Sequence, residues 1–319
     1  MRHILFVCTI IFSFSITSPT RASGQPPLTI GILTDAQYCN CSPSGPRQYI
    51  SSPAKLDSCI AVFNEQKVSA VFHLGDLIDH RYISYDSMLP RFKKSLAPVH
   101  FVMGNHDFMV DDLVKDSVLR KYNLPNPYYT ATIGNWKFII LNGDDLSYQA
   151  PMDKERKAER DSIVLLLWQS IRCNMMPWNG GVGKSQLGWL RNELRLAQEQ
   201  HQQVIVMCHF PVYPADCFNL YNDRQIVNLL SEYSCVKAYF NGHHHSGNYG
   251  YRNGIHFVNF KGMVDTPVNS FALVTLRQDS ILIEGKGRET DRRLKVEGGN
   301  LEIRSRNEWN NIMPSTTKQ

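Results

Sequence analysis

The stretch Val102-Met103-Gly104-Asn105-His106-Asp107 joins the end of an apolar run to an amide, an imidazole and a carboxylate. The run, residues 99–103, is typical of a buried strand and stops at Gly104. Open α/β sheets place their chemistry at such strand ends. A single Asn-His-Asp tripeptide also suits a surface turn, so its meaning depends on whether other runs end in the same way.

Four other apolar runs also end in side chains that can bind a metal ion. They are residues 30–34, 71–74, 204–208 and 236–240. Helical patterns alternate with the runs at residues 55–66, 87–96, 185–200 and 222–233. This alternation indicates βαβ units with parallel strands.

Other segments add antiparallel strands and a further helix. Residues 128–142 are typical of a hairpin turned at Gly134-Asn135, and the chain after residue 255 has an all-β pattern. Residues 111–122 are expected to be helical, with Leu113 and Val118 on the inner face. We therefore predict an α/β fold with mixed β-sheets.

The composition is that of an ordinary soluble globular protein. Of 319 residues, 43% are hydrophobic and 20% are charged, enough for a large core. The formal net charge is +5, but Lys and Arg are scattered, so no basic stripe for nucleic acid is evident. The sequence leaves the oligomeric state open.

The first 22 residues are interpreted as a signal peptide. Arg2 and His3 precede an apolar stretch at residues 4–16, and Ala22-Ser23-Gly24 offers a cleavage region. The apolar stretch is shorter than the ~20 residues that a membrane-spanning helix needs. We therefore expect a secreted or periplasmic protein without a stable membrane anchor.

Residues 28–297 are predicted to form one domain, followed by a polar C-terminal tail at residues 298–319. Residues 144–183 are the least regular part and are too short to bury a core of their own, so we expect an inserted cap or lid. Within them, Asn179-Gly180-Gly181-Val182-Gly183 lacks the Lys-Ser/Thr of a phosphate-binding loop, which favours a flexible connector.

Seven cysteines remain after the predicted signal peptide, an odd number for an oxidising compartment. At least one thiol must therefore stay free or pair elsewhere, and Cys208 in its buried run is the best candidate. Cys39 and Cys41 have no second pair at zinc-finger spacing, which favours a disulfide or a loop thiol over a metal site.

The loop ends together supply a set of nitrogen and oxygen ligands without a thiolate. The set is Asp35, Gln37, Asp76, Asn105, His209, His243 and His245. Such ligands suit Mn²⁺, Fe²⁺ or Zn²⁺. Seven ligands exceed what one ion uses, whereas two ions that share a carboxylate would use them all. Paired ions of this kind stabilise the attacking and leaving oxygens of a displacement at phosphorus.

These residues form five blocks that resemble the motifs of the calcineurin-like metallophosphoesterases. The blocks are Asp35-x-Gln37, Gly75-Asp76-x-x-Asp79, Gly104-Asn105-His106-Asp107, His209 and Gly242-His243-x-His245, in family order. The resemblance implies two packed mixed sheets flanked by helices, an α-β-β-α sandwich. It also implies that Asp76 bridges two ions, with the remaining ligands divided as Asp35, Gln37 and His245 for one and Asn105, His209 and His243 for the other.

Most members of that family have His where this chain has Gln37. An amide oxygen is a harder donor than an imidazole, which favours Mn²⁺ over Zn²⁺ at the first site. Gln at this position is similar to the manganese-dependent ADP-ribose/CDP-alcohol diphosphatases. Three other stretches also resemble that subgroup: Asn179-Gly180-Gly181 before Gln186-Leu187, and residues 247–250 and 261–266.

His106, next to the ligand Asn105, is the candidate proton donor to the leaving phosphate oxygen. Asp79 or Asp107 is expected to orient an imidazole, and a metal-bound hydroxide is the expected nucleophile. His244 lies between two ligands on an extended segment and is expected to point to the opposite face.

Candidate substrate contacts follow the same strands. Arg47 and Arg81 are candidates for a second phosphate, because a guanidinium fits phosphate oxygens in a fork. Aromatic residues in the later loops either stack on a nucleobase or fasten the loops, and both readings stay open. They are Phe210, Tyr213, Tyr221, Tyr249 and Tyr251.

We therefore expect a secreted hydrolase that cleaves the diphosphate bond of nucleoside diphosphate derivatives such as ADP-ribose or CDP-alcohols. One alternative is a phosphomonoesterase, or a phosphodiesterase for cyclic nucleotides or glycerophosphodiesters, of the same superfamily. Purple acid phosphatase is disfavoured, because Asp79 stands where that family has a metal-binding Tyr. The other alternative is a secreted metal- or nucleotide-binding protein, against which the proton donor His106 argues.

Overall fold

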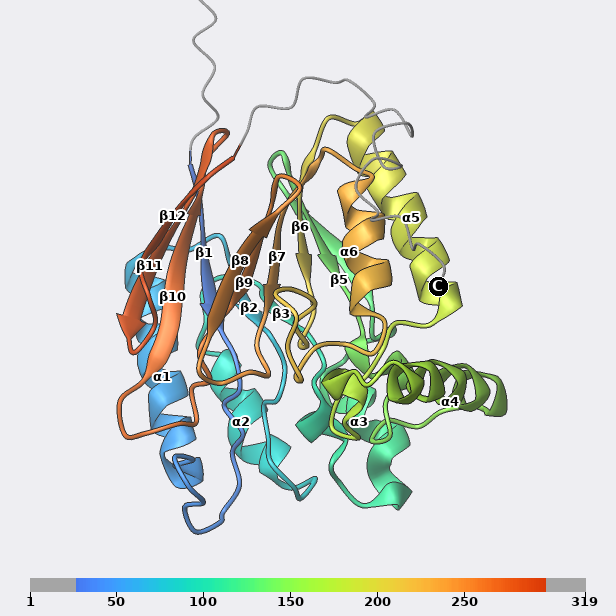
Figure 1. The fold of residues 1–319 in the computed structure, drawn as a ribbon. Helices are drawn as coiled ribbons and strands as arrows, with labels where there is room; N and C mark the ends of the chain where they lie inside the picture. Colours follow the sequence, from blue (N-terminus) through green and yellow to red (C-terminus); the bar gives the residue numbers. More distant parts are fainter. Residues whose placement is uncertain (1–26, 297–319) are drawn as a thin grey trace, which may run out of the picture.

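Figure 1 shows the computed structural model, which describes residues 27–296. Two β-sheets lie face to face, and helices cover their outer faces. The prediction of two packed mixed sheets flanked by helices is confirmed. The predicted signal peptide, residues 1–22, and the predicted tail, residues 298–319, lie outside the described residues.

The first sheet has six strands. In spatial order they are β12 (Arg292–Lys295), β11 (Ser280–Gly287), β10 (Ser270–Leu276), β1 (Leu28–Leu33), β2 (Ala70–His73) and β3 (Val99–Phe101). β1, β2 and β3 are parallel, and β10 pairs antiparallel with β1. The loops after the three parallel strands therefore meet at one edge of the sheet.

The second sheet also has six strands. In spatial order they are β4 (Tyr129–Ile133), β5 (Trp136–Ile140), β6 (Gln203–Met207), β7 (Val236–Asn241), β9 (Ile255–Asn259) and β8 (Asn248–Arg252). The predicted hairpin is β4 with β5, and β5, β6, β7 and β9 are parallel. The carboxyl ends of β6 and β7 therefore also meet at one edge.

The core between the sheets follows from the two-residue period of the strands. Ile30 and Ile32 of β1 belong to the same buried cluster as Phe138 of β5. Gly31, between them, faces the outer helices, where a Cβ atom would lie 2.7 Å from the Phe63 ring. The apolar run of β1 is interrupted by glycine because the neighbouring helix packs against its backbone.

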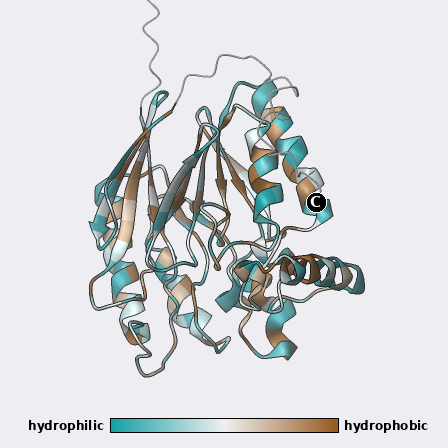
Figure 2. Cartoon of the chain, in the orientation of Figure 1, coloured by the Kyte–Doolittle hydropathy of each residue, from teal (hydrophilic) through white to brown (hydrophobic). Residues whose placement is uncertain are grey.

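Helices cover each outer face in pairs. The first sheet carries α1 (Ser52–Glu65) and α2 (Ser84–Phe92), and the second carries α5 (Lys184–Glu199) and α6 (Asp223–Ser231). Figure 2 shows hydrophobic and hydrophilic residues alternating along α5. Leu187, Leu190 and Leu194 form the buried stripe of α5, as the helical spacing predicts.

The segment predicted to be a lid contains η4 (Gly143–Leu146), α4 (Lys154–Gln169) and η5 (Cys173–Met175). Its charged and apolar parts form one continuous helix, α4, which lies below α5 and projects to the right in Figure 1. The second half of α4 and the turn after it expose Leu165, Leu166, Trp168 and Ile171. That the segment is an insertion stays a prediction.

Two local predictions were wrong: the single helix at residues 111–122 and the buried position of Leu113. Residues 111–122 are not one amphipathic helix but a 3-10 segment, η3 (Asp112–Ser117), followed by one turn, α3 (Val118–Lys121). Val118 is buried as predicted, whereas Leu113 is 92% exposed. Asp111 accepts a hydrogen bond from the backbone N–H of Leu113 and begins the tight 3-10 turn, which turns Leu113 outwards.

The cysteines form two disulfides, Cys39–Cys41 and Cys173–Cys217. Cys208 is free and buried, as predicted. Cys59 and Cys235 are also free and buried within residues 27–296. Over the same residues, every helix is too short or too polar to cross a lipid bilayer.

Candidate metal centre

The loops after the parallel strands bring the predicted ligands together from both sheets. Asp35 follows β1 and Asp76 follows β2, and the two loops are joined by hydrogen bonds from Asp35 N to Gly75 O and from Gln37 N to Asp76 O. His243 follows β7 of the other sheet, and its N–H donates to Asp35 Oδ2 at 3.2 Å. One edge of the sandwich thus carries a single cluster.

The backbone is strained at four of the predicted ligands. Asp35, Gln37, Asp76 and His243 have φ angles of 51°, 41°, 58° and 68°. L-residues rarely adopt this left-handed conformation, and it persists where the surroundings impose it, as they often do at functional sites. The strain directs these side chains into the cluster and supports a binding role.

Imidazoles and carboxylates lie within ion-pair distance of one another in the cluster. His209 Nε2 lies 3.1 Å from Asp76 Oδ2, and His245 Nε2 lies 3.3 Å from Asp35 Oδ1. His243 Nδ1 lies 3.2 Å from His209 Nε2. The ligand atoms of Asp76, His209 and His243 all lie within 4.8 Å of one another.

Three buried oxygens in the cluster have no hydrogen-bond partner among the described residues: Asp35 Oδ1, Gln37 Oε1 and Asn105 Oδ1. A buried polar atom without a partner costs about 1–3 kcal/mol, so such atoms are rare in folded proteins. A cation would satisfy all three. The donors are oxygen and imidazole nitrogen, a set that fits Mn²⁺ and its neighbours in the series.

Each of the three imidazoles is held from behind by a hydrogen-bond acceptor. His209 Nδ1 donates to the Leu74 carbonyl at 2.8 Å, and His245 Nδ1 donates to Asp265 Oδ1 at 3.0 Å. His243 Nε2 lies 3.0 Å from Asn179 Oδ1. The opposite ring nitrogen of each imidazole is therefore free to face the cluster, as metal-binding histidines require.

Carboxylates of the cluster raise the pKa values of two neighbouring imidazoles. Burial would lower the pKa of His209, but Asp76 outweighs burial and raises it to about 10. Burial would likewise lower the pKa of His245, but Asp35 raises it to about 9. Metal binding displaces such protons, so the carboxylates that hold them are the groups that would attract a cation.

His106 is held beside this cluster at two points. Its backbone N–H donates to Asp76 Oδ1 at 2.8 Å, and its Nδ1 lies 2.8 Å from Asp79 Oδ1. Burial would lower the pKa of His106, but Asp76 and Asp79 outweigh burial and raise it. His106 lines the pocket described below, so its Nε2 is the atom left to carry a proton to a bound molecule.

The carboxylate of Asp107 makes its hydrogen bonds away from the imidazoles, and its catalytic role stays a prediction. Its carboxylate accepts hydrogen bonds from the backbone N–H groups of Asp76, Leu77 and Gly104 and from the Tyr122 hydroxyl. It ties the loop after β2 to the loop after β3. Of the two candidate carboxylates, Asp79 is the one in contact with His106.

A pocket of about 330 Å³ opens over the cluster. It is lined by the ligands Gln37, Asp76, Asn105, His243 and His245, by His106 and Arg47, and by Met109, Gln149, Pro177, Trp178 and Phe218. Its volume lies within the range of small-molecule sites. The pocket thus combines metal-binding groups, one guanidinium and two aromatic side chains.

Several predicted substrate contacts lie elsewhere. Arg47 lines the pocket, but Arg81 and the proposed aromatic residues of the later loops do not. His244 also lies outside the lining, stacked on Phe218 at 4.5 Å between ring centres and 3.3 Å from Asp216. It supports the aromatic wall from behind.

Sequence reasoning missed Trp178, Phe218, Asn179 and Asp265. Asn179 begins a glycine-rich run that was interpreted as a flexible connector, yet the residue is fully buried against His243. Asn179 and Asp265 both lie in stretches that resembled the diphosphatases, and that resemblance was the available signal. Trp178 and Phe218 carried no signal in the sequence, because only the fold brings their loops together.

A model of the calcineurin-like phosphoesterase family matches residues 28–247. The chain belongs to this family. The match covers all five sequence blocks and accounts for the ligands that converge from both sheets. This calcineurin-like phosphoesterase is therefore a metal-dependent hydrolase, as the sequence predicted.

Curated relatives of this calcineurin-like phosphoesterase carry the name manganese-dependent ADP-ribose/CDP-alcohol diphosphatase. The protein of that name from Xenopus laevis is 26% identical, over 85% of this chain and 91% of its own length. The human and Arabidopsis thaliana proteins are each 24% identical and cover 85% and 84% of this chain, and 93% and 96% of their own lengths.

Two solved structures show the same fold. A dimetal phosphatase from Danio rerio superposes with a TM-score of 0.77 at 23% identity, over 86% of this chain and 100% of its own. A purple acid phosphatase from yellow lupin gives a TM-score of 0.56 at 15% identity, over 86% of this chain and 54% of its own. Both likenesses concern the fold alone.

Proposed function

We propose that this protein hydrolyses the diphosphate bond of nucleoside diphosphate derivatives, such as ADP-ribose and CDP-alcohols, with two Mn²⁺ ions. The observation that carries the proposal is the pocket, which places Arg47, Trp178 and Phe218 beside the ligand cluster. A guanidinium suits a second phosphate, and aromatic rings suit a nucleobase. The relatives described above, which match over 84–85% of this chain, support the same substrate class.

The residues that would hold the cations are those of the cluster. Asp35, Gln37 and His245 would hold one, Asn105, His209 and His243 the other, and Asp76 both. Bound there, the cations would stabilise charge on the phosphate and lower the pKa of a water molecule so that it attacks phosphorus as hydroxide. Gln37 supplies an amide oxygen in place of an imidazole, which favours Mn²⁺ over Zn²⁺.

The chain itself supplies binding groups and a proton. Arg47 lines the pocket, so its guanidinium is available to the phosphate that is not attacked. The same guanidinium lies 3.9 Å from Asp79 Oδ2. His106, oriented by Asp79, would protonate the leaving phosphate oxygen through Nε2. Trp178 and Phe218 would bind the base by stacking, without selecting strongly among bases.

The decisive experiment measures product release by metal-stripped protein with Mn²⁺, Mg²⁺ or Zn²⁺ restored. The substrates are ADP-ribose, CDP-choline and p-nitrophenyl phosphate. We expect Mn²⁺-dependent release of AMP and CMP with slow attack on the monoester. Preferred cleavage of the monoester would replace the diphosphatase assignment by a phosphomonoesterase, and inactivity with every metal would favour a binding protein.

Matched variants link the activity to the cluster. Asp76→Ala removes the carboxylate proposed to bridge both cations and is expected to abolish turnover. Asp112→Ala removes an exposed carboxylate whose ion pair is with Lys115, and is expected to leave turnover unchanged. Normal activity in Asp76→Ala would rule out the cluster as the active site.

We also propose that the protein is exported. The supporting observations are the predicted signal sequence and two disulfides, since disulfides persist in oxidising compartments and are rare in the cytosol. Mass spectrometry of the mature protein tests this. A chain that begins near residue 23 is expected, whereas an intact N-terminus on protein recovered from cytosol would contradict export.

A further inference from the structure

Asn179 lies beside the proposed ligand His243 and uses every hydrogen-bonding group of its side chain. Its Oδ1 is 3.0 Å from His243 Nε2. Its Nδ2 donates to the carbonyl oxygens of Asn174, at 3.0 Å, and Cys217, at 2.7 Å. Asn179 is 0% exposed, so water does not compete for these bonds.

The two carbonyl groups fix which way the amide points. A carbonyl oxygen only accepts hydrogen bonds, so the NH₂ group of Asn179 must face Asn174 and Cys217. Its Oδ1 must therefore face His243, where it can only accept. In the neutral imidazole this hydrogen bond requires the proton to be on Nε2 of His243, which leaves Nδ1 unprotonated. That nitrogen lies 3.2 Å from His209 Nε2, inside the ligand cluster.

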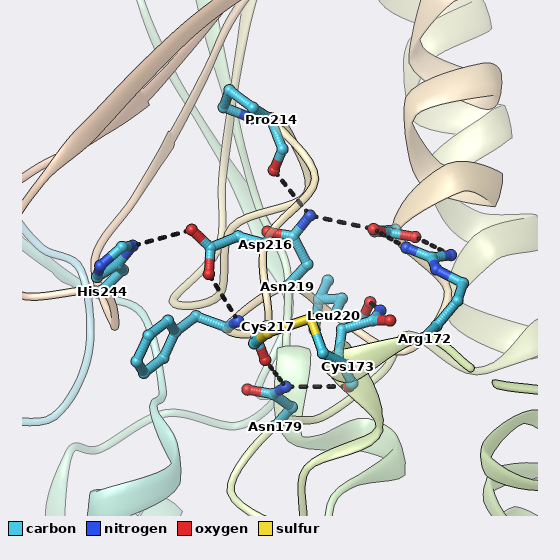
Figure 3. The surroundings of a disulfide bond; sticks show 12 residues. Arg172, Cys173, Asn179, Pro214, Asp216, Cys217, Asn219, Leu220 and His244 are labelled. Atoms are coloured by element: carbon cyan, nitrogen blue, oxygen red, sulfur yellow. Dashed lines mark hydrogen bonds and ion pairs between the residues drawn. A yellow bond between two sulfur atoms is a disulfide. The ribbon is translucent and has the colours of Figure 1, made fainter. Parts of the chain in front are cut away.

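The frame around Asn179 is rigid. Cys217 forms a disulfide with Cys173, the residue before Asn174, and this disulfide joins the lid segment to the loop after β6. Figure 3 shows Asn179 beside this disulfide, linked to Cys217 by a dashed line. Gly180 follows directly, and a Cβ atom there would lie 2.1 Å from the Gly143 carbonyl oxygen. The backbone therefore has little room to move Asn179 away from His243.

We infer that Asn179 is a positioning residue that keeps the proton of His243 on Nε2 and so holds Nδ1 ready for the second cation. The disulfide-closed lid thereby sets the affinity of that cation site. The inference rests on the proposed dinuclear centre but not on the choice of substrate.

The first test needs no substitution. Nitrogen–proton correlation spectra of metal-free, full-length protein with isotope-labelled histidine report which ring nitrogen carries the proton. His243, assigned by the signal that is lost in His243→Gln, is expected to carry it on Nε2 alone. A proton on Nδ1 in the wild-type protein would overturn the inference.

The second test compares two Asn→Leu variants in the same disulfide-closed turn. Asn179→Leu has a similar volume but cannot accept from His243. Calorimetric titration with Mn²⁺ is expected to show one of two sites weakened by roughly 10- to 100-fold, the usual effect of losing such a partner. Spectra of the same variant should show His243 protonated on either nitrogen.

Asn174→Leu is the matched control. The Asn174 side chain is also buried and donates to the Leu220 carbonyl at 2.7 Å, but it does not touch His243. It should retain both Mn²⁺ sites at wild-type affinity. Equal weakening of Mn²⁺ binding in the two variants would mean that general loosening of the lid causes the effect, and would overturn the inference. Unchanged Mn²⁺ affinity in Asn179→Leu would also overturn it. Neither measurement involves a substrate. Failure of the inference about Asn179 can therefore be distinguished from failure of the diphosphatase assignment.

Discussion

His106 is the residue whose replacement should separate chemistry from metal binding. It lines the pocket and contacts Asp76 and Asp79 but is not one of the proposed ligands. His106→Ala is expected to lower kcat by about 10²- to 10⁴-fold, the usual range for a general acid, while calorimetry shows unchanged Mn²⁺ binding.

His80 provides the control for His106. Its Nε2 lies 3.3 Å from the same oxygen, Asp79 Oδ1, but its side chain is 56% exposed and lies outside the pocket lining. His80→Ala should keep kcat within a few-fold of the wild-type value. If His106→Ala also kept its rate, the leaving oxygen would have to receive its proton from another group.

His73 gives the fold a sensitivity to acid. It is fully buried in β2, its Nδ1 accepts from Gly75 N–H, and its Nε2 has no hydrogen-bond partner within residues 27–296. Burial lowers the pKa of His73 to about 4 from its usual value of about 6.5. As the pH falls below 6.5 the unfolded chain binds this proton first, so stability present above pH 6.5 is lost progressively towards pH 4.

The expected size of this loss is about 2 kcal/mol of unfolding free energy between pH 7 and pH 5. His73→Phe cannot be protonated and should lack this part of the pH dependence, whatever its stability at pH 7. Urea unfolding of metal-free protein at both pH values measures the difference. Parallel losses in the two proteins would assign the acid sensitivity to other groups.

At the scale of elements, two glycines should respond to alanine in opposite ways. In the lid segment, a Cβ atom on Gly180 would meet the Gly143 carbonyl oxygen at 2.1 Å, so Gly180→Ala should destabilise the fold by about 1–3 kcal/mol. In α5, nothing lies within 4 Å of a Cβ atom on Gly188, and Gly188→Ala should stabilise the helix by about 0.5–1 kcal/mol. Denaturant midpoints measure both, and a stable Gly180→Ala would mean that the lid can shift.

The sequence predicted the elements with strong periodicity and failed where side-chain contacts decide. β1, β2 and the stripe of α5 follow directly from their patterns. Residues 111–122 have a helical pattern as well, but a 3-10 turn capped by Asp111 takes the place of the first helical turns. One local hydrogen bond outweighed a weak periodic preference, which a pattern of apolar residues does not record.

The candidate site could likewise be predicted where strand patterns place its residues, but not where side-chain contacts place them. Ligands at strand ends could be found because the parallel topology brings every such end to one edge. Trp178 and Phe218 could not, since they come from irregular segments that a disulfide and local hydrogen bonds bring to that edge, and Asn179 was indicated only by the resemblance of its stretch to the diphosphatases. The sequence left Asp79 and Asp107 as alternatives for orienting an imidazole, because a carboxylate that binds backbone N–H groups looks the same in a sequence as one that binds imidazole.

At the scale of the whole molecule, the proposed cations would join the two sheets. Asp35 and Asp76 follow strands of the first sheet, whereas His209 and His243 follow strands of the second. The unfolded chain cannot bring these side chains together, so binding should stabilise the folded state. Mn²⁺ at a hundred times its Kd is expected to add about 2.7 kcal/mol for each site.

A thermal shift measures this linkage. At about 2–4 °C per kcal/mol for a protein approaching this size, two sites should raise Tm by roughly 10–20 °C above that of chelator-treated protein. Asp76→Ala, which lacks the carboxylate shared by both sites, should show little of this increase. An equal shift in the variant would place the stabilising Mn²⁺ elsewhere.

Within residues 27–296, Cys59, Cys208 and Cys235 are free and buried, and their reactivity can report local opening of the structure. Burial raises the pKa of Cys59 to about 12 and those of Cys208 and Cys235 to about 11, so a thiol reagent would modify them only after the surrounding structure opens. Cys59 lies in the layer outside the first sheet, and Cys208 and Cys235 lie in that outside the second. Labelling rates at these positions would therefore reveal whether the halves of the sandwich come apart together or in sequence.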